Sequence, residues 1–186
     1  MVLRLLGYRN VATMGDYRAS LALAHQIGSI PDITATRKPG RTKCGFGVNF
    51  EQPLADDGAT GLFGRYGWDD GATESFAYTE IDRTACLGPQ ISGRRWHRPN
   101  DRLAVAAVQN DLAAAHKDYL AAGGLGFLLG DGKLNYGAEQ IMEAYYSYQI
   151  AKPLALSLDY QIINHPGYNR DRGPVSVASI RVHLEY

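Results

Sequence analysis

The last twelve residues, 175–186, constrain the fold most strongly because their side chains alternate between two chemical types. One face of an extended strand here carries Ala178, Ile180, Val182, Leu184 and Tyr186. The other face carries Ser179, Arg181, His183 and Glu185. Side chains in a strand alternate faces with a period of two, so one face is apolar and the other charged. A soluble sandwich also alternates, but a barrel strand between lipid and water explains both the pattern and the aromatic end.

Seven further segments show strand character, which predicts an all-β chain of about eight antiparallel strands. They are Val2–Arg9, Lys43–Gln52, Thr60–Asp69, Tyr78–Ser92, Arg102–Asn110, Glu139–Ile150 and Leu154–Asn164. Proline lacks the N–H that a ladder needs, so we expect a bulge or a local break at Pro89.

The lengths of the connections alternate, which indicates an outer-membrane barrel with short periplasmic turns and long outer loops. Counting back from Tyr186, the connections are long, short, long, short, medium, short and long. On this topology Tyr148 and Tyr186 lie at the periplasmic ends of their strands, whereas Tyr66 and Trp68 lie near the outer ends. Amphipathic rings favour the headgroup zones, so these side chains predict two aromatic girdles.

Two of the long loops carry helix signals. Asp16 is a possible N-cap for a helix over Tyr17–Ile27, with Gly28 as its end, and Asp111 is a possible N-cap for a helix over Leu112–Ala122. The apolar stretch that follows, Leu125–Gly132, is too hydrophobic to lie freely in water. We therefore expect Phe127 and Leu128 to be buried against the barrel mouth.

Composition excludes some classes of protein and restricts others. Lys plus Arg equals Asp plus Glu at 19 each, and this balance argues against nucleic-acid binding. No run of about 18 apolar residues predicts a transmembrane helix. The first residues, Met1–Arg9, read as the middle of a strand and lack a signal-peptide cleavage site, so we expect the chain to begin partway through a larger protein. Cys44 and Cys86 are expected to be free thiols.

Four blocks of sequence resemble the OprB-like carbohydrate-selective porins. They are Gly61–Trp68, Thr73–Arg83, His116–Tyr136 and Gly167–Val175. The resemblance covers nearly the whole chain and implies a 16-stranded transmembrane antiparallel β-barrel in the outer membrane, of which residues 1–186 form the C-terminal half as one domain. Eight strands alone would enclose no aqueous channel.

The resemblance also implies a function. Such a porin passes carbohydrates by passive diffusion, needs no cofactor or metal, and is not an enzyme. Its partners are sugars, outer-membrane lipid and the barrel-assembly machinery, which would recognise the C-terminal Tyr186. No nucleic-acid partner is expected.

The polar faces of the strands supply the candidates for the lumen. We expect Arg65, Arg83, Glu143, Tyr145, Asp159, Arg181 and His183 to line the sugar path. Arg and carboxylate side chains on opposite walls offer donors and acceptors to sugar hydroxyls. Arg83 needs a register change near Pro89 to face inward. The loop residues His116, Lys117, Asp118 and Tyr119 are expected to narrow the channel.

Two other classes of function stay open. A small barrel enzyme acting on lipid would draw on Glu74, Ser75 and His116, although their spacing does not recommend them. A structural or adhesive barrel would bind other molecules through its loops. The paired carboxylates Asp69/Asp70 and Glu80/Asp82 are interpreted as solvated loop groups or lumen lining rather than as acid–base catalysts.

Overall fold

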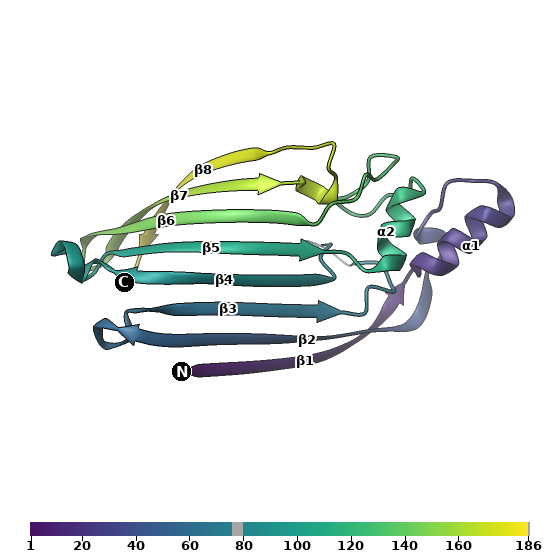
Figure 1. Cartoon of the computed structure of the whole chain (residues 1–186). Coiled ribbons are helices and arrows are strands. Elements are labelled where there is room, and N and C mark those ends of the chain that lie inside the picture. The colour runs from purple at the N-terminus through teal and green to yellow at the C-terminus, as the bar shows by residue number, and fades with distance from the viewer. Residues whose placement is uncertain (76–79, 186) are drawn as a thin grey trace.

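The computed structural model describes residues 1–75 and 80–185 and contains one antiparallel sheet of eight strands. Every strand pairs with its neighbour in sequence, in the order β1 to β8 (Figure 1). The strands are β1 (Val2–Met14), β2 (Lys38–Ala55), β3 (Thr60–Asp69), β4 (Arg83–Ser92), β5 (Arg102–Asp111), β6 (Glu139–Ala151), β7 (Leu154–Asn164) and β8 (Val175–Leu184). The predicted antiparallel β architecture is confirmed.

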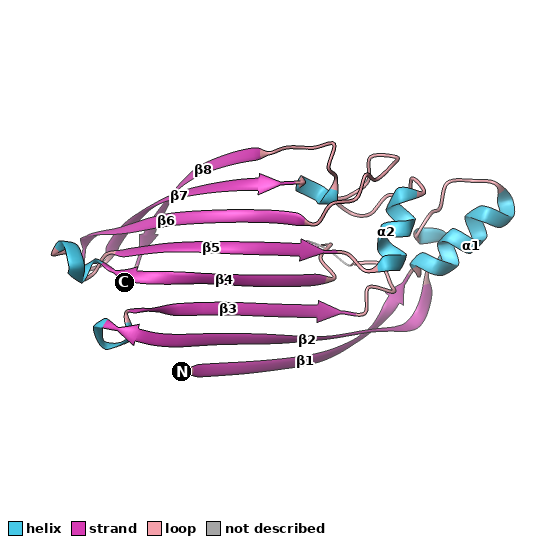
Figure 2. Cartoon of the chain, in the orientation of Figure 1, coloured by secondary structure: helices cyan, strands magenta, loops and turns pink. Residues whose placement is uncertain are grey.

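The alternation of short and long connections is confirmed as well. The turns β2–β3, β4–β5 and β6–β7 lie at one end of the sheet, which we call the short-turn end, and the loops with both α-helices lie at the other, the long-loop end (Figure 2). The short turns contain two 3-10 helices, η2 (Asp56–Gly58) and η3 (Gly93–Trp96). Two more, η1 (Thr34–Thr36) and η4 (Pro166–Tyr168), belong to the long loops.

Several strand limits differ from those predicted. β1 and β2 are longer than the patterns indicated, because their pairing continues from Arg9 opposite Cys44 to Met14 opposite Lys38. β4 begins at Arg83 rather than Tyr78, a residue that lies outside the described part. The β4–β5 ladder is interrupted between Leu87 and Gln90, at Pro89, while its register is kept. The expected local break is therefore present.

The first predicted helix is confirmed, whereas the start of the second is wrong. α1 spans Tyr17–Ile27. The Asp16 carboxylate accepts a hydrogen bond from the Ala19 amide at 2.8 Å, and Gly28 ends the helix in the left-handed conformation. α2 spans Ala114–Ala121 and has Ala113 as its N-cap. Asp111 cannot cap α2, because it is the last residue of β5 and its carboxylate accepts from the adjacent Leu112 amide.

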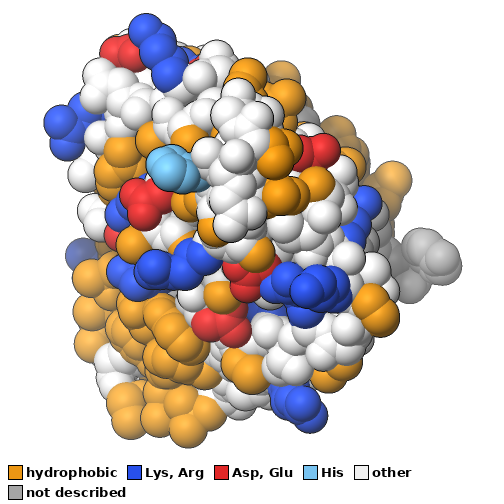
Figure 3. All heavy atoms as spheres, turned by 90° about the vertical axis from the view of Figure 1, so that its right-hand side faces the viewer, with side chains coloured by type: hydrophobic (Ala, Val, Ile, Leu, Met, Phe, Trp, Pro, Cys, Tyr) orange, Lys and Arg blue, Asp and Glu red, His pale blue; other side chains and the backbone are white. Residues whose placement is uncertain are grey.

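In the part of the chain that the structure describes, the hydrophobic core lies in the long loops and no second layer packs on the sheet. Its buried members are Tyr17, Ile33, Leu112, Ala115, Tyr119, Leu120 and Tyr168. The strands instead expose large apolar side chains, such as Leu5, Leu158 and Ile180. Figure 3 views the long-loop end, where charged side chains lie among apolar ones and hydrophobic side chains gather at the lower left. A sheet with an uncovered apolar face needs an apolar medium against it.

Within the described residues, no α-helix has the length and hydrophobicity to cross a membrane. Among the described strands, β1 and β8 each have one partner, so the sheet has two open edges. Cys44 and Cys86 are free thiols, as expected. They lie on opposite faces of the sheet. Cys86 pairs with Arg65 and shares its face, whereas Cys44 shares the face of Phe46, which pairs with Trp68 on the other side.

Candidate functional site: the polar face of the sheet and its loops

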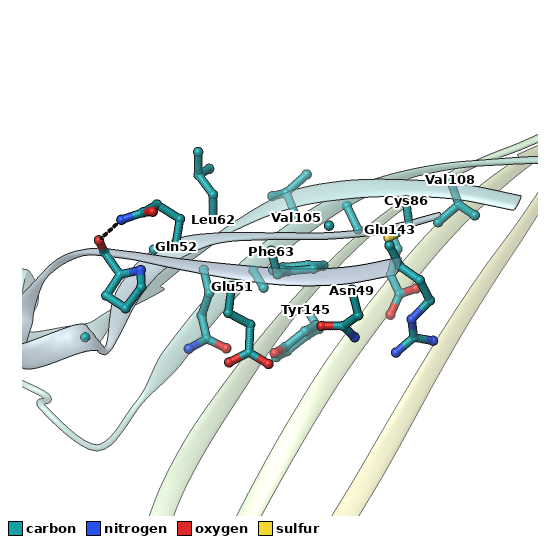
Figure 4. Close-up of a pocket in the computed structure, with 18 residues that line it drawn as sticks. Asn49, Glu51, Gln52, Leu62, Phe63, Cys86, Val105, Val108, Glu143 and Tyr145 are labelled. Atoms are coloured by element: carbon teal, nitrogen blue, oxygen red, sulfur yellow. Dashed lines mark hydrogen bonds between the residues drawn. The ribbon is translucent and has the colours of Figure 1, made fainter. Parts of the chain in front are cut away.

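Strand register collects polar side chains on one face of the sheet. Arg65 pairs with Asn49 on one side and with Cys86 on the other, and these three side chains therefore share a face. Figure 4 shows the two faces directly: Leu62 and Val105 point to one side of the strands, whereas Asn49, Glu51 and Tyr145 point to the other. We call the second side the polar face.

A cavity of about 650 Å³ opens on the polar face, between β2 and β6. Arg65 of β3 and Glu143 of β6 both line it, so a cation and a carboxylate contribute to one hollow. On the polar face the lining also includes a second carboxylate, Glu51, and the neutral polar or aromatic side chains of Asn49, Gln90, Phe63 and Tyr145. This volume is ample for one small ligand, because pockets for small molecules measure about 300–1,000 Å³.

The other lumen candidates share this face by register. Tyr145 pairs with Asp159, which in turn pairs with Ser179, and the Ser179 hydroxyl lies 3.5 Å from the Asp159 carboxylate. Arg181 and His183 follow Ser179 at intervals of two and therefore point the same way. Along the sheet the charges run positive on Arg65, negative on Glu143 and Asp159, and positive again on Arg181.

Arg83 does not belong to this set. The β3–β4 register pairs Arg83 with Trp68 without a shift from Gly61 to Trp68, which places Arg83 on the face opposite Arg65. Arg83 could face the lumen only if the register of β4 changed. The described part of β4 shows no such change, because the β4–β5 pairing stops at Pro89 and resumes in the same register. The prediction that Arg83 faces the lumen is therefore wrong.

The four constriction candidates separate into two buried and two accessible side chains. His116 is 0% exposed and Tyr119 is 1% exposed, so neither can contact a molecule in a channel, and these two predictions are wrong. The reason is that α2 turns this side toward α1. Lys117 is half-buried; its ammonium lies 2.8 Å from the Asp111 carboxylate and 3.9 Å above the Tyr136 ring. Asp118 is exposed.

A buried chain of three polar side chains joins α1, α2 and the segment before β4. The Nδ1 atom of His116 lies 3.0 Å from Oδ2 of Asp82, and its Nε2 atom lies 3.2 Å from the Tyr17 hydroxyl. An ionised carboxylate can only accept, so Nδ1 donates to Asp82, and in the neutral imidazole Nε2 then accepts from the Tyr17 hydroxyl. The Tyr17 and His116 rings are also stacked, with centroids 4.3 Å apart.

Opposing effects set the ionisation of Asp82 and Tyr17 in this hydrogen-bonded set of side chains. Burial disfavours the charged form of Asp82, but the hydrogen bonds from His116 and from the Ala113 amide hold the pKa of Asp82 below its ordinary value. Burial raises the pKa of Tyr17, with the charge of Asp82 acting in the same direction. The group is therefore an ionised carboxylate facing a neutral phenol across a histidine.

A second buried carboxylate, Glu80, organises the loop after α2. It accepts hydrogen bonds from the amides of Phe127 at 2.6 Å and Leu129 at 2.9 Å, and the Leu128 amide lies 3.4 Å away. This gathering of amides turns the loop so that, of these three residues, Leu129 packs on the core, while Phe127 and Leu128 are 68% and 65% exposed. The expected burial of Phe127 and Leu128 is wrong.

The interpretation of Glu80 and Asp82 as solvated groups is also wrong, because both are buried. Sequence reasoning missed their role. The sequence pattern placed both residues inside a strand that begins at Tyr78, whereas their partners Ala113 and Phe127 lie 31 and 47 residues away. Asp101 was missed in the same way; it precedes β5 and is 1% exposed.

Two of the three residues proposed for a lipid enzyme, Glu74 and His116, bind other groups. Glu74 binds the Arg37 guanidinium through both oxygens at 2.8 Å and the Gly15 amide at 2.7 Å. His116 is engaged by Asp82 and Tyr17. Within the described residues, no group of three or more His, Cys, Asp or Glu is placed to hold a metal ion.

Comparisons with known proteins agree with this architecture. The OprB of Pseudomonas putida, in a structure determined at high pH, superimposes with a TM-score of 0.76 at 18% sequence identity, covering 98% of this chain and 44% of that chain. This chain therefore spans less than half of that protein, and the likeness shows the fold. No curated protein matches this chain. The family model for the carbohydrate-selective porin, OprB family, matches residues 2–186, and the chain belongs to that family.

Proposed function

We propose that this chain forms part of an outer-membrane β-barrel through which carbohydrates diffuse passively. The observation that carries the proposal is the two-faced sheet: one face exposes apolar side chains that need lipid, and the other holds a 650 Å³ cavity between Arg65 and Glu143. Membership of the OprB family supports it independently. In this arrangement the short-turn end faces the periplasm and the long-loop end faces the outside.

The chemistry of the cavity suits neutral sugars. Sugars carry many hydroxyls and no charge, so a wall with donors from Arg65 and Asn49 and an acceptor from Glu143 satisfies them on opposite sides. The Tyr145 ring supplies an apolar face for the C–H side of a pyranose. Opposite charges across one hollow also order water and hinder ions without hindering an uncharged solute.

The sugar path that we propose uses the residues of the polar face: Arg65, Glu143, Tyr145, Asp159, Arg181 and His183. Lys117 and Asp118 are the accessible constriction candidates at the outer mouth. Tyr186, the predicted signal for the barrel-assembly machinery, lies outside the described residues. The complete wall requires strands against the open edges of β1 and β8, since unpaired backbone groups are costly in lipid.

Liposome swelling tests the proposal. The gene product that contains these 186 residues is reconstituted, and swelling is followed in glucose and in a larger inert oligosaccharide. We expect fast swelling in glucose and slow swelling in the oligosaccharide. Arg65→Ala, which removes bulk and a donor from the wall, should raise the relative rate for the larger sugar. If the liposomes swelled neither in glucose nor in the oligosaccharide, passive diffusion would be contradicted.

A further inference from the structure

The turn between β4 and β5 is strongly basic for a short connection. Residues 93–101 contain Arg94, Arg95 and Arg98, and Asp101 is the only carboxylate among them. The neighbouring turn between β6 and β7 adds Lys152. Both turns lie at the short-turn end (Figure 1). The distribution of this charge depends on what Asp101 binds.

Asp101 is saturated by Arg98 of the same turn and by two residues of β6. Its Oδ2 atom accepts from Arg98 Nε at 2.5 Å and from the Tyr146 hydroxyl at 2.5 Å, and its Oδ1 accepts from the Gln149 amide at 3.0 Å. It is almost fully buried. Asp101 therefore neutralises Arg98 and leaves the exposed cations of the two turns without compensation from this carboxylate.

An aromatic platform lies directly beside these cations. The Trp96 indole N–H donates to the Tyr146 hydroxyl at 2.9 Å, and the Arg98 guanidinium lies 3.9 Å from the centre of the Tyr148 ring. Register pairs Tyr146 with Leu158, on the apolar face of the sheet. Tyr148 is two residues further along β6, so its ring shares that face. Indole and phenol groups with an apolar body and a bonded polar tip are typical of a membrane interface.

The remaining cations of the two turns are exposed. Arg95 and Lys152 are exposed, and neither has a carboxylate partner in the part of the chain that the structure describes. Arg98 Nη2 donates to the Gln149 carbonyl at 3.0 Å, and Gln149 Nε2 lies 3.3 Å from the Lys152 carbonyl, so the two turns are tied together. Arg94 pairs with Asp57, but Asp57 is 85% exposed and the pair is well screened by water.

We propose that this basic corner, which consists of Arg95 and Lys152 in the two turns together with Trp96, Tyr146 and Tyr148, binds the phosphate headgroup of an anionic phospholipid in the adjacent leaflet. The inference rests on the proposed membrane placement. Cations at a membrane surface attract anionic lipid, and the fixed aromatic rings hold the corner at headgroup depth. The Asp101 network keeps the corner rigid, so little ordering is needed on binding.

Fluorescence quenching by brominated lipids tests this inference with the intact chain. In the gene product that contains these 186 residues, Trp68 and any tryptophan outside residues 1–186 are replaced by phenylalanine, so that Trp96 is the single tryptophan. The protein is reconstituted in vesicles with increasing brominated phosphatidylglycerol or, separately, brominated phosphatidylcholine, and the Trp96 quenching curves give relative binding constants. We expect a preference for phosphatidylglycerol, on the order of fivefold for each cation at low salt. The double variant R95Q/K152Q and raised salt should both abolish this preference.

A matched control removes a cation at the opposite end. Lys133→Gln lies in the loop between α2 and β6 and is exposed, so it should leave the preference at Trp96 unchanged. Equal quenching by the two lipids would overturn the inference while leaving the membrane placement intact. If neither lipid quenched Trp96, both the membrane placement and the inference would be overturned. If the preference for phosphatidylglycerol survived in R95Q/K152Q, other residues would be responsible for it, and the assignment to the basic corner would be wrong.

Discussion

The Nδ1 atom of His116 lies 3.0 Å from Oδ2 of Asp82, with both side chains fully enclosed at the long-loop end of the sheet. Removal of the imidazole strands a carboxylate in a dry site. His116→Ala is expected to destabilise the packed loops by about 3 kcal/mol, because the buried carboxylate keeps its desolvation cost with only the Ala113 amide left as a hydrogen-bond donor. Limited proteolysis of the loops in detergent micelles measures the effect. Asp118→Ala, an exposed change on the same helix, should leave the cleavage rate unaltered.

The stability of the same loops should fall only in strong acid. The pKa of Asp82 in the folded protein lies below its ordinary value of 3.8. A depressed folded pKa means that the ionised group stabilises the protein above that ordinary value, and this contribution is lost as the pH falls through the folded pKa. Loop protection measured across pH should therefore be flat above about pH 4 and decline below it. Asp82→Asn should reduce the decline, with the remainder due to other carboxylates of these loops such as Glu80; an unchanged decline would assign all of it to those carboxylates.

The two cysteines provide an internal test of which face is wet. Cys86 lines the cavity on the polar face, and Cys44 lies exposed on the other. In a bilayer, a charged thiol reagent should modify Cys86 in the Cys44→Ser variant and slow sugar entry. The Cys86→Ser variant, with Cys44 alone, should react faster with an apolar maleimide than with the charged reagent. The reverse order would place lipid against the polar face.

Glu80 should control the exposed apolar loop. Glu80→Ala removes the acceptor shared by the Phe127 and Leu129 amides, so their hydrogen exchange should rise by about tenfold or more, since bonds to a charged group contribute about 1.5–3 kcal/mol. Exchange read by mass spectrometry over residues 125–130 measures this. Asp131→Ala, in the same loop, is the control: it bonds Asn169 and Arg172 instead, so exchange at Phe127 should stay slow.

Periodicity was sufficient for the strands and insufficient for the loops. Alternation along 175–184 predicts β8, and the cap at Asp16 with Gly28 predicts α1, because both signals are local. The face of Arg83 was wrong because a proline can interrupt a ladder without shifting it.

The loop residues failed for a different reason. His116 and Tyr119 lie near Lys117 and Asp118 in sequence, yet two are buried and two accessible. The difference arises from α1, which begins 99 residues before His116. Likewise, Glu80 lies 47 residues from Phe127, whose exposure it determines through the backbone. Contacts of such separation leave no trace in the spacing of apolar residues.

The neighbour-to-neighbour order of the eight strands has a consequence for how such walls change size. No strand depends on a partner distant in the chain, so a whole hairpin can be duplicated or deleted while every surviving pair is kept. The diameter of a closed wall grows with the number of strands. Evolution or protein engineering can therefore change the diameter of such a barrel by one hairpin at a time, without redesigning the remaining strand pairs.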